Sequence, residues 1–218
     1  MTPNEFALKV PFSVFVSGPS QSGKTRFTQR ILNNVEKGVL SKPIKKIVYA
    51  YSKWQPAFQE MRDNDASMTF YEGLPTKEEL TEWTKDGEDL LLVLDDLVYR
   101  VIQSFDYMEL FSIYVHHLKV SVIFISQNLF PQGKYSRVIS LNCQYLVLFK
   151  NPRDNFQIRY LATQLYPRNT SYFLDAYDKA TQKPYSYLLV DLSVSAKREY
   201  ALRTGIFPGD LLSVFMKS

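Results

Sequence analysis

Short apolar runs alternate with segments of helical periodicity along most of this chain. The runs are rich in β-branched and aromatic residues and predict strands at 12–16, 45–51, 68–71, 90–94, 120–126, 145–149 and 185–191. Apolar positions three and four residues apart predict helices at 27–35, 54–61, 76–85, 107–117 and, interrupted by Pro167, across 152–180. Strands that alternate with helices are typical of an α/β protein with a mostly parallel sheet and helices on its faces.

A glycine-rich turn follows the first predicted strand. Residues 18–25 match the G-x-x-x-x-G-K-[ST] pattern of a phosphate-binding loop, in which backbone N–H groups at a helix start surround an anion. Lys24 is expected to reach the β- and γ-phosphates, and the Thr25 hydroxyl to ligate Mg²⁺. The predicted ATP-binding residues are Gly18, Pro19, Ser20, Gln21, Ser22, Gly23, Lys24, Thr25 and Arg26.

Polar side chains follow two later strands, at the sheet edge where α/β proteins bind ligands. Asp95 and Asp96 end the run 90–94. We expect Asp95 to hold Mg²⁺ and Asp96 to polarise the attacking water. Gln127 follows the run 120–126, and it is expected to hold that water or sense the γ-phosphate, with Asn128 as second choice. A helix N-cap pair and a plain strand-to-loop turn are the alternatives.

Composition narrows the class of protein. The 218 residues suit one α/β domain, 1–218, and 45% hydrophobic residues with 22% charged ones indicate a globular chain. The lone Cys143 excludes an internal disulfide and is predicted to be a small buried thiol. No apolar run approaches the roughly 20 residues that span a bilayer, and the N-terminus lacks the features of a signal peptide. We therefore expect an intracellular protein.

Five segments together resemble the FtsK/HerA superfamily of P-loop DNA-pumping ATPases. They are 17–25, 92–97, 126–133, 145–154 and 203–209. The resemblance is closer to the genome-packaging ATPases of poxvirus-like large DNA viruses, Polinton/Maverick elements and adintoviruses. It implies a three-layer P-loop NTPase fold in which the sensor strand lies between the loop strand and the strand of the acid pair.

The resemblance also implies a function. It is ATP-driven translocation of double-stranded DNA, which packages a viral or virus-like genome into a capsid. The implied cofactors are ATP and Mg²⁺. The implied partners are double-stranded DNA, further copies of the chain in a homo-oligomeric ring, and capsid or portal proteins, with no membrane. The implied location is the host nucleus or a cytoplasmic virus factory, and the virion as a further site.

Basic residues near the predicted nucleotide edge have two candidate roles. Lys134 and Arg137, in a predicted loop at 129–137, are candidate DNA contacts, and a solvated surface loop is the alternative. Phosphoryl-transfer motors commonly use an arginine from a neighbouring subunit. Arg153 is the first candidate because Pro152 restricts the turn before it; Arg137 and Arg100 follow.

Two rival functions fit the phosphate loop. A nucleoside or nucleotide kinase has a similar loop and size, but usually carries an arginine-rich lid, whereas 129–153 contains two arginines, Arg137 and Arg153. A non-motor ATP-binding assembly switch would turn over slowly without DNA stimulation. Phosphate release from ATP alone, compared with nucleoside-monophosphate-dependent ADP formation, separates the kinase from the ATPase. Tyrosines across 156–187 are expected to pack in the core, and His116-His117 lacks a third metal ligand.

Overall fold

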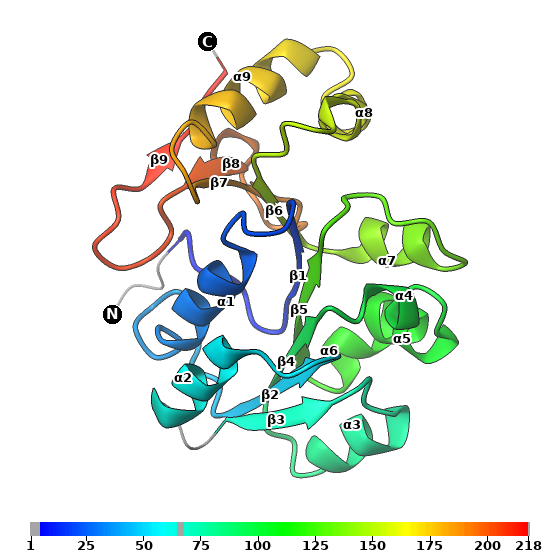
Figure 1. Ribbon diagram of the computed structural model, residues 1–218. Helices are drawn as coiled ribbons and strands as arrows, with labels where there is room; N and C mark the ends of the chain where they lie inside the picture. The colour runs from blue at the N-terminus through cyan, green and yellow to red at the C-terminus, as the bar shows by residue number, and fades with distance from the viewer. Residues whose placement is uncertain (1–4, 65–67, 218) are drawn as a thin grey trace.

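A single twisted sheet forms the centre of the molecule (Figure 1). The computed structural model describes residues 5–64 and 68–217. The strand order is β3-β2-β4-β5-β1-β6-β7-β8-β9. The strands are β1 Ser13–Ser17, β2 Lys46–Tyr51, β3 Thr69–Glu72, β4 Leu90–Asp95, β5 Val120–Ser126, β6 Tyr145–Phe149, β7 Tyr187–Asp191, β8 Leu202–Thr204 and β9 Ser213–Val214. Those from β3 to β6 run parallel, and β7 to β9 continue antiparallel.

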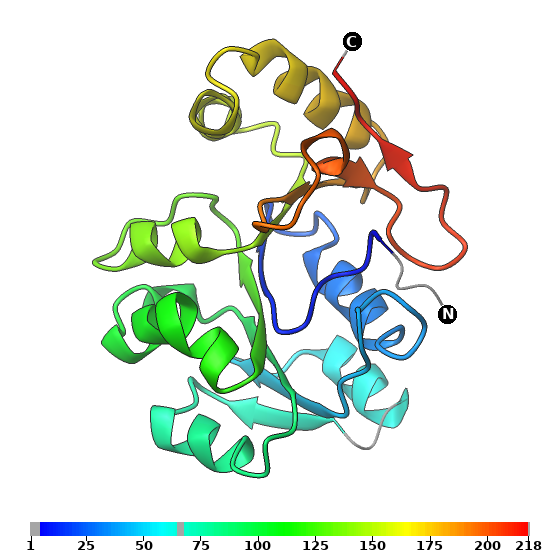
Figure 2. The ribbon, with the colours of Figure 1, turned by 180° about the vertical axis from the view of Figure 1, so that it is seen from behind.

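Helices cover both faces of the sheet and make three layers (Figure 2). One face carries α1 Lys24–Leu32 and α2 Pro56–Asn64. The other carries α3 Lys77–Trp83, α4 Val98–Val101, α5 Phe105–Glu109, α6 Val115–His117, α7 Ser136–Asn142, α8 Asn155–Leu165 and α9 Thr170–Ala180. A π-helical turn, Leu110–Tyr114, joins α5 to α6. No helix among the described residues is long and apolar enough to cross a membrane.

The central strands are buried on both faces, which explains their continuous apolar runs. In β4, Leu91 and Val93 pack with α1 and α2, while Leu92 and Leu94 pack with the helices of the other face. The strand order places β5 between β1 and β4. The predicted mostly parallel α/β sheet, with the sensor strand in that position, is confirmed.

Several predicted boundaries need correction. The helix predicted at 27–35 begins at Lys24 and ends at Leu32. Asn33 and Asn34 follow Leu32, and the Asn34 side chain donates to the Arg30 carbonyl, a local bond that competes with helix continuation. The last predicted strand begins at Tyr187 and is antiparallel to β6.

The helix α7 was not predicted from the sequence. Only Ile139 of this helix is buried, so no apolar stripe marks it. Arg137, expected in a loop, therefore lies in the first turn of α7. The strands β8 and β9, of three and two residues, are also absent from the predicted elements. Cys143 is buried as predicted, and its thiol donates to the Ile139 carbonyl.

Candidate functional site

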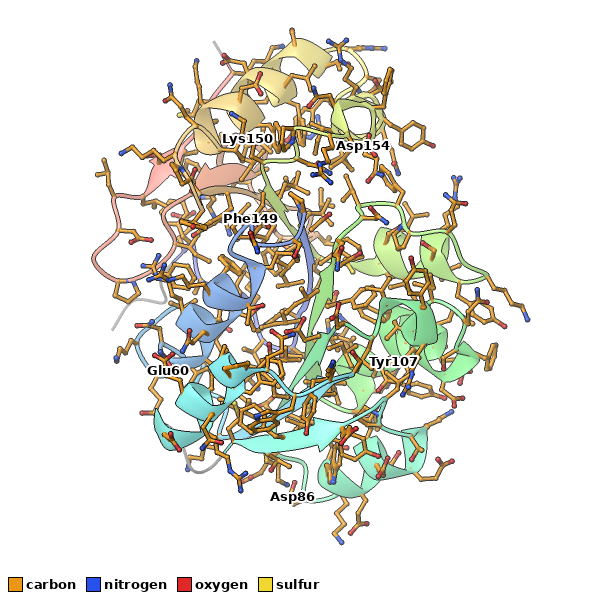
Figure 3. The ribbon with its side chains drawn as sticks, viewed as in Figure 1. Glu60, Asp86, Tyr107, Phe149, Lys150 and Asp154 are labelled. Atoms are coloured by element: carbon orange, nitrogen blue, oxygen red, sulfur yellow. The ribbon has the colours of Figure 1, made fainter. Side chains whose placement is uncertain are left out.

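The phosphate loop connects the end of β1 to the start of α1. Gly23 is the N-cap of α1 with φ 106°, and Gln21 also has a positive φ of 63°. A Cβ on Gly18 would lie 2.6 Å from Phe149 Cβ and 2.7 Å from Ser22 Oγ. Glycine is therefore required at both ends of the loop, where the backbone is left-handed at one and closely packed at the other. Figure 3 shows Phe149 beside this turn.

Two side chains inside the loop suit an anion. Lys24 is 9% exposed, and its Nζ donates to the carbonyl oxygens of Gly18 and Pro19, each at 2.7 Å. Burial lowers the pKa of Lys24, an effect that the charges of Asp95 and Asp96 oppose. Ser22 Oγ is buried and has no hydrogen-bond partner among the described residues. A phosphate oxygen would supply that partner and would offset the burial of the ammonium.

The acid at the end of β4 is buried and held by a tyrosine. Asp95 is 5% exposed, and the Tyr49 hydroxyl donates to its Oδ2 at 2.7 Å from the neighbouring strand β2. Burial raises the pKa of Asp95; the Tyr49 hydrogen bond opposes this rise, and the charge of Asp96 adds to it. A nearby cation would favour the ionised carboxylate.

The donor set suits Mg²⁺ that is held partly by phosphate. The Thr25 hydroxyl and the Asp95 carboxylate are the predicted protein ligands, and both are hard oxygen donors. No group of three or more His, Cys, Asp or Glu side chains in 5–64 and 68–217 is placed to hold a metal ion. Mg²⁺ usually keeps several waters and binds through one or two protein groups plus substrate phosphates, so it fits this pair of ligands.

Asp96 and Gln127 stand at the same edge of the sheet as the loop. Asp96 is exposed and has φ 59°, a turn that directs the chain away from β4. Gln127 is also exposed, and its turn is held by Ser126, whose Oγ donates to the Asn128 carbonyl at 2.6 Å. The Gly18 N–H donates to the Ser126 carbonyl, which ties the loop to the end of β5. Parallel β4, β5 and β1 thus bring the predicted acid pair, sensor and loop together.

The turn after β6 carries Arg153 and is held by several hydrogen bonds. Tyr177 Oη donates to the Phe149 carbonyl and accepts from the Asn151 N–H, both at 3.0 Å. The Arg153 N–H donates to Asn151 Oδ1. The Arg153 side chain is exposed and makes no ion pair with any residue that the structure describes. The turn thus holds the Arg153 backbone by a hydrogen bond while its side chain points to the surface.

A hydrogen-bond network links α8 to the sensor segment. Gln157 Oε1 accepts from the Leu129 N–H at 2.9 Å, and Gln157 Nε2 donates to Asp154 Oδ2 at 2.6 Å. Asp154 also caps α8 by accepting from the Gln157 N–H. Asp154, Gln157 and Gly18 line one small cavity of about 10 Å³, which is about the size of one water. The start of α8 therefore adjoins both the sensor segment and the phosphate loop.

The other predicted cations lie on the surface. Lys134 is exposed, with Nζ 4.9 Å from the centroid of the Tyr135 ring. Arg137 is exposed on α7, and Arg26 is exposed on α1. Arg100 reaches toward Gly73, with its Nη1 3.5 Å from the position that a Cβ there would take.

A hollow of about 870 Å³ opens beyond the end of the phosphate loop. It is lined by α1 residues that include Arg26 and by the segments 179–187 and 204–215. Tyr185 lines this hollow, and its side chain is 62% exposed. Its backbone has a positive φ of 63°, and its ring atom Cδ1 lies 3.2 Å from the position that a Cβ on Gly23 would take. The expectation of core packing is thus wrong for Tyr185 and for Tyr160, which is 59% exposed, and right for Tyr177 and Tyr187. A second hollow, of about 820 Å³, includes Asp191 and lies at the opposite edge of the sheet, away from this site.

Sequence reasoning missed Tyr49, Gln157 and Tyr185. Tyr49 could have been found only with the strand order in hand, because its register beside β4 is what aims it at Asp95. Gln157 lies in a helix with several other polar residues, and no sequence pattern distinguishes it from them. Tyr185 is one of 15 tyrosines, and its backbone conformation is what distinguishes it.

Comparison with known proteins shows the fold. No protein-family model matches the chain, and neither does any curated protein. The genome packaging NTPase B204 from Sulfolobus turreted icosahedral virus 2, in complex with ATP-gammaS, matches with a TM-score of 0.59 at 12% identity over 100% of both chains. The same protein in complex with AMP matches with a TM-score of 0.50 at 13% identity, over 88% of this chain and 94% of that one. The chain has the α/β fold of these NTPases.

Proposed function

We propose that this chain is an ATPase that moves double-stranded DNA and packages a viral or virus-like genome into a capsid. The observation that carries the proposal is the meeting of the phosphate loop, the buried Asp95 and Gln127 at one sheet edge. The chain also shares its fold over its full length with a protein described as a genome packaging NTPase. The branch of FtsK/HerA-type ATPases found in Polinton elements and adintoviruses remains part of the proposal, on the sequence resemblance alone.

The residues divide the chemistry among them. Lys24 and the loop N–H groups bind the β- and γ-phosphates. Thr25 and Asp95 would hold Mg²⁺, which neutralises phosphate charge when bound. Asp96 accepts a proton from the attacking water or orients it, and Gln127 positions that water without adding negative charge. These are the roles that hydrolysis of ATP requires.

The hollow next to Tyr185 receives the rest of the nucleotide. It begins at Gly23 and Arg26, where the phosphates would end, and a volume of about 870 Å³ exceeds what a base and ribose need. The Tyr185 ring offers an aromatic face for the base. This placement adds Tyr185 to the predicted ATP-binding residues.

The partners are proposed from the sequence resemblance and the surface charges. Lys134 and Arg137 are candidate contacts to the DNA backbone, and both are exposed beyond the sensor segment. Phosphate contacts of this kind tolerate any base sequence and weaken steeply with salt. Copies of the chain in a ring and capsid or portal proteins complete the proposed machine.

The test is phosphate release from ATP with and without duplex DNA. We expect hydrolysis to rise with duplexes of unrelated sequence and the DNA effect to fall with salt. Lys24→Ala should nearly abolish turnover, while Lys37→Ala, an exposed lysine outside the site, should not. ADP formation that requires a nucleoside monophosphate would indicate a kinase. Slow turnover that DNA does not change would indicate a switch.

A further inference from the structure

The outer face of α8 carries exposed aromatic and arginine side chains. Phe156 is 85% exposed and Tyr160 is 59% exposed, one helical turn apart. Arg159 lies between them, and Arg153 lies just before the helix. Exposed aromatics next to arginines are the composition of binding hot spots in protein interfaces. We call Arg153, Phe156, Arg159 and Tyr160 the α8 surface.

The region around the α8 surface is strongly basic. Residues 130–168 contain six cations and one acid, Asp154. None of these cations takes part in an ion pair within the described residues. They are Lys134, Arg137, Lys150, Arg153, Arg159 and Arg168. Figure 3 shows Lys150 at this end of the molecule.

Acids outnumber cations at the opposite end of the sheet, from α2 to the start of β4, although Lys45, Lys46 and Lys53 lie on and beside β2 next to them. The described residues of 56–89 contain nine acids and three cations. Five acids there are exposed and form no ion pair: Glu60, Asp63, Glu72, Glu78 and Glu88. We call these five residues the acidic end, and Figure 3 shows Glu60 and Asp86 on this side, far from Lys150. The exposed aromatic side chain of Tyr99 (77%) lies near this surface. Its sequence neighbour Arg100 extends to Gly73, which follows Glu72.

We propose that the α8 surface of one copy docks on the acidic end of a second copy. The choice of a second copy rests on the oligomer proposed above, and the charges supply the complementarity. Because the two surfaces differ, the contact is head to tail and repeats into a ring if its rotation closes. Opposite charges on the two surfaces steer the encounter and select the register.

The order of elements along the nucleotide edge gives this contact a consequence. From the acidic end, the edge presents Asp95 and Asp96, then Gln127, then the phosphate loop, then Arg153. A copy docked by its α8 surface on the acidic end brings Arg153 to the Asp96 side of its neighbour's site. The link from α8 through Gln157 to Leu129 then connects that contact to the first copy's own sensor segment.

A charge exchange between the two surfaces tests the pairing. One variant carries Arg153→Glu and Arg159→Glu, the other Glu72→Lys and Glu78→Lys, and sedimentation velocity measures assembly with ATPγS present. Each variant alone should self-associate at least ~10-fold more weakly than the original chain. An equimolar mixture should assemble, because every contact in it again joins opposite charges. Lys9→Glu with Lys37→Glu, two exposed lysines outside both surfaces, is the matched control.

The apolar part has its own variant pair. Phe156→Ala with Tyr160→Ala should weaken assembly at least ~10-fold. Val194→Ala with Met216→Ala, which removes exposed apolar side chains elsewhere, should not. Circular dichroism and the melting temperature confirm that each variant is folded.

The outcomes separate this inference from the proposed function. An original chain that stays monomeric with ATPγS and DNA, or a mixture that fails to assemble, overturns the inference. So does an arginine variant that assembles normally but loses DNA binding, which would make the α8 surface a nucleic-acid contact. Chains that assemble through these surfaces but do not hydrolyse ATP would support the inference and refute the proposed ATPase.

Discussion

Replacing Asp95 by Asn should stabilise the metal-free protein at neutral pH. Burial raises the pKa of Asp95 above its ordinary value of 3.8, so the folded chain holds this proton more tightly than the unfolded chain does. Between the ordinary and the raised pKa, the folded state binds more protons, and stability therefore falls as pH rises through that window. Asn cannot ionise, and its side-chain oxygen can still accept from Tyr49, so it escapes this loss.

The size of the gain follows from the pKa. Each unit of rise costs about 1.4 kcal/mol once the carboxylate is ionised. For a chain of this length, 1 kcal/mol corresponds to ~2–4 °C in melting temperature, so each unit should appear as ~3–6 °C. The gain should vanish well below pH 3.8, where both folded and unfolded chains are protonated at this site.

The assay is thermal or urea unfolding in EDTA at a series of pH values, repeated with Mg²⁺ and ATPγS. Without ligand, Asp95→Asn should melt above the original chain, increasingly so as pH rises. With ligand, the original chain should gain far more than the variant, because ligands that bind only the folded state stabilise it. Glu60→Gln is the control: Glu60 is exposed on α2, away from Asp95, and its stability should change by less than ~0.5 kcal/mol. A variant that is less stable at every pH, or a gain that ignores pH, would refute the reasoning.

The remaining predictions concern turnover. Asp96→Asn should bind Mg-ATP normally and hydrolyse it ~10²–10⁴-fold more slowly, measured by nucleotide titration and phosphate release; equal loss of binding in Asp95→Asn and Asp96→Asn would contradict the division of roles. Mixing Lys24→Ala with Arg153→Ala chains should restore part of the activity that each lacks, and mixed oligomers that stay inactive would exclude Arg153 acting in a neighbour's site. Tyr185→Ala should raise KM for ATP on the order of 10-fold with little change in kcat, and an unchanged KM would remove the base from this hollow.

Features formed by residues close together in sequence can be predicted from the sequence of this chain. The phosphate loop needs glycines, a lysine and a hydroxyl in one continuous stretch. Each central strand is a continuous apolar run because it is buried on both faces. The capping box of α3 appears as Thr76 followed by Glu79, and the structure contains both of its hydrogen bonds. Features whose residues are adjacent in sequence were therefore predictable.

Side-chain contacts between segments far apart in the sequence cannot be predicted in this way. Tyr49 reaches Asp95 only because β2 pairs with β4, and Gln157 reaches Leu129 only because the fold brings the start of α8 to the segment after β5. The sequence resemblance placed β5 between β1 and β4, yet it named no side chain that crosses between strands. Short elements such as α4 and α7 bury one residue each and leave no periodic signal.

The candidate site has buried charged groups at the phosphate loop and an exposed arginine at the far end of the same sheet edge. Lys24 and Asp95 are buried, and burial lowers the pKa of Lys24 and raises the pKa of Asp95, so a bound anion and a bound cation would favour their charged forms. Arg153 is exposed at the far end of the same edge; its backbone N–H donates to Asn151, and its side chain has no ion-pair partner within the described residues. Under the proposed function, one chain is expected to bind nucleotide by itself and to need a second cation at the γ-phosphate from a neighbouring copy. Hydrolysis should therefore depend on protein concentration in the range where copies associate, and a turnover number that is constant across that range would show that one chain suffices.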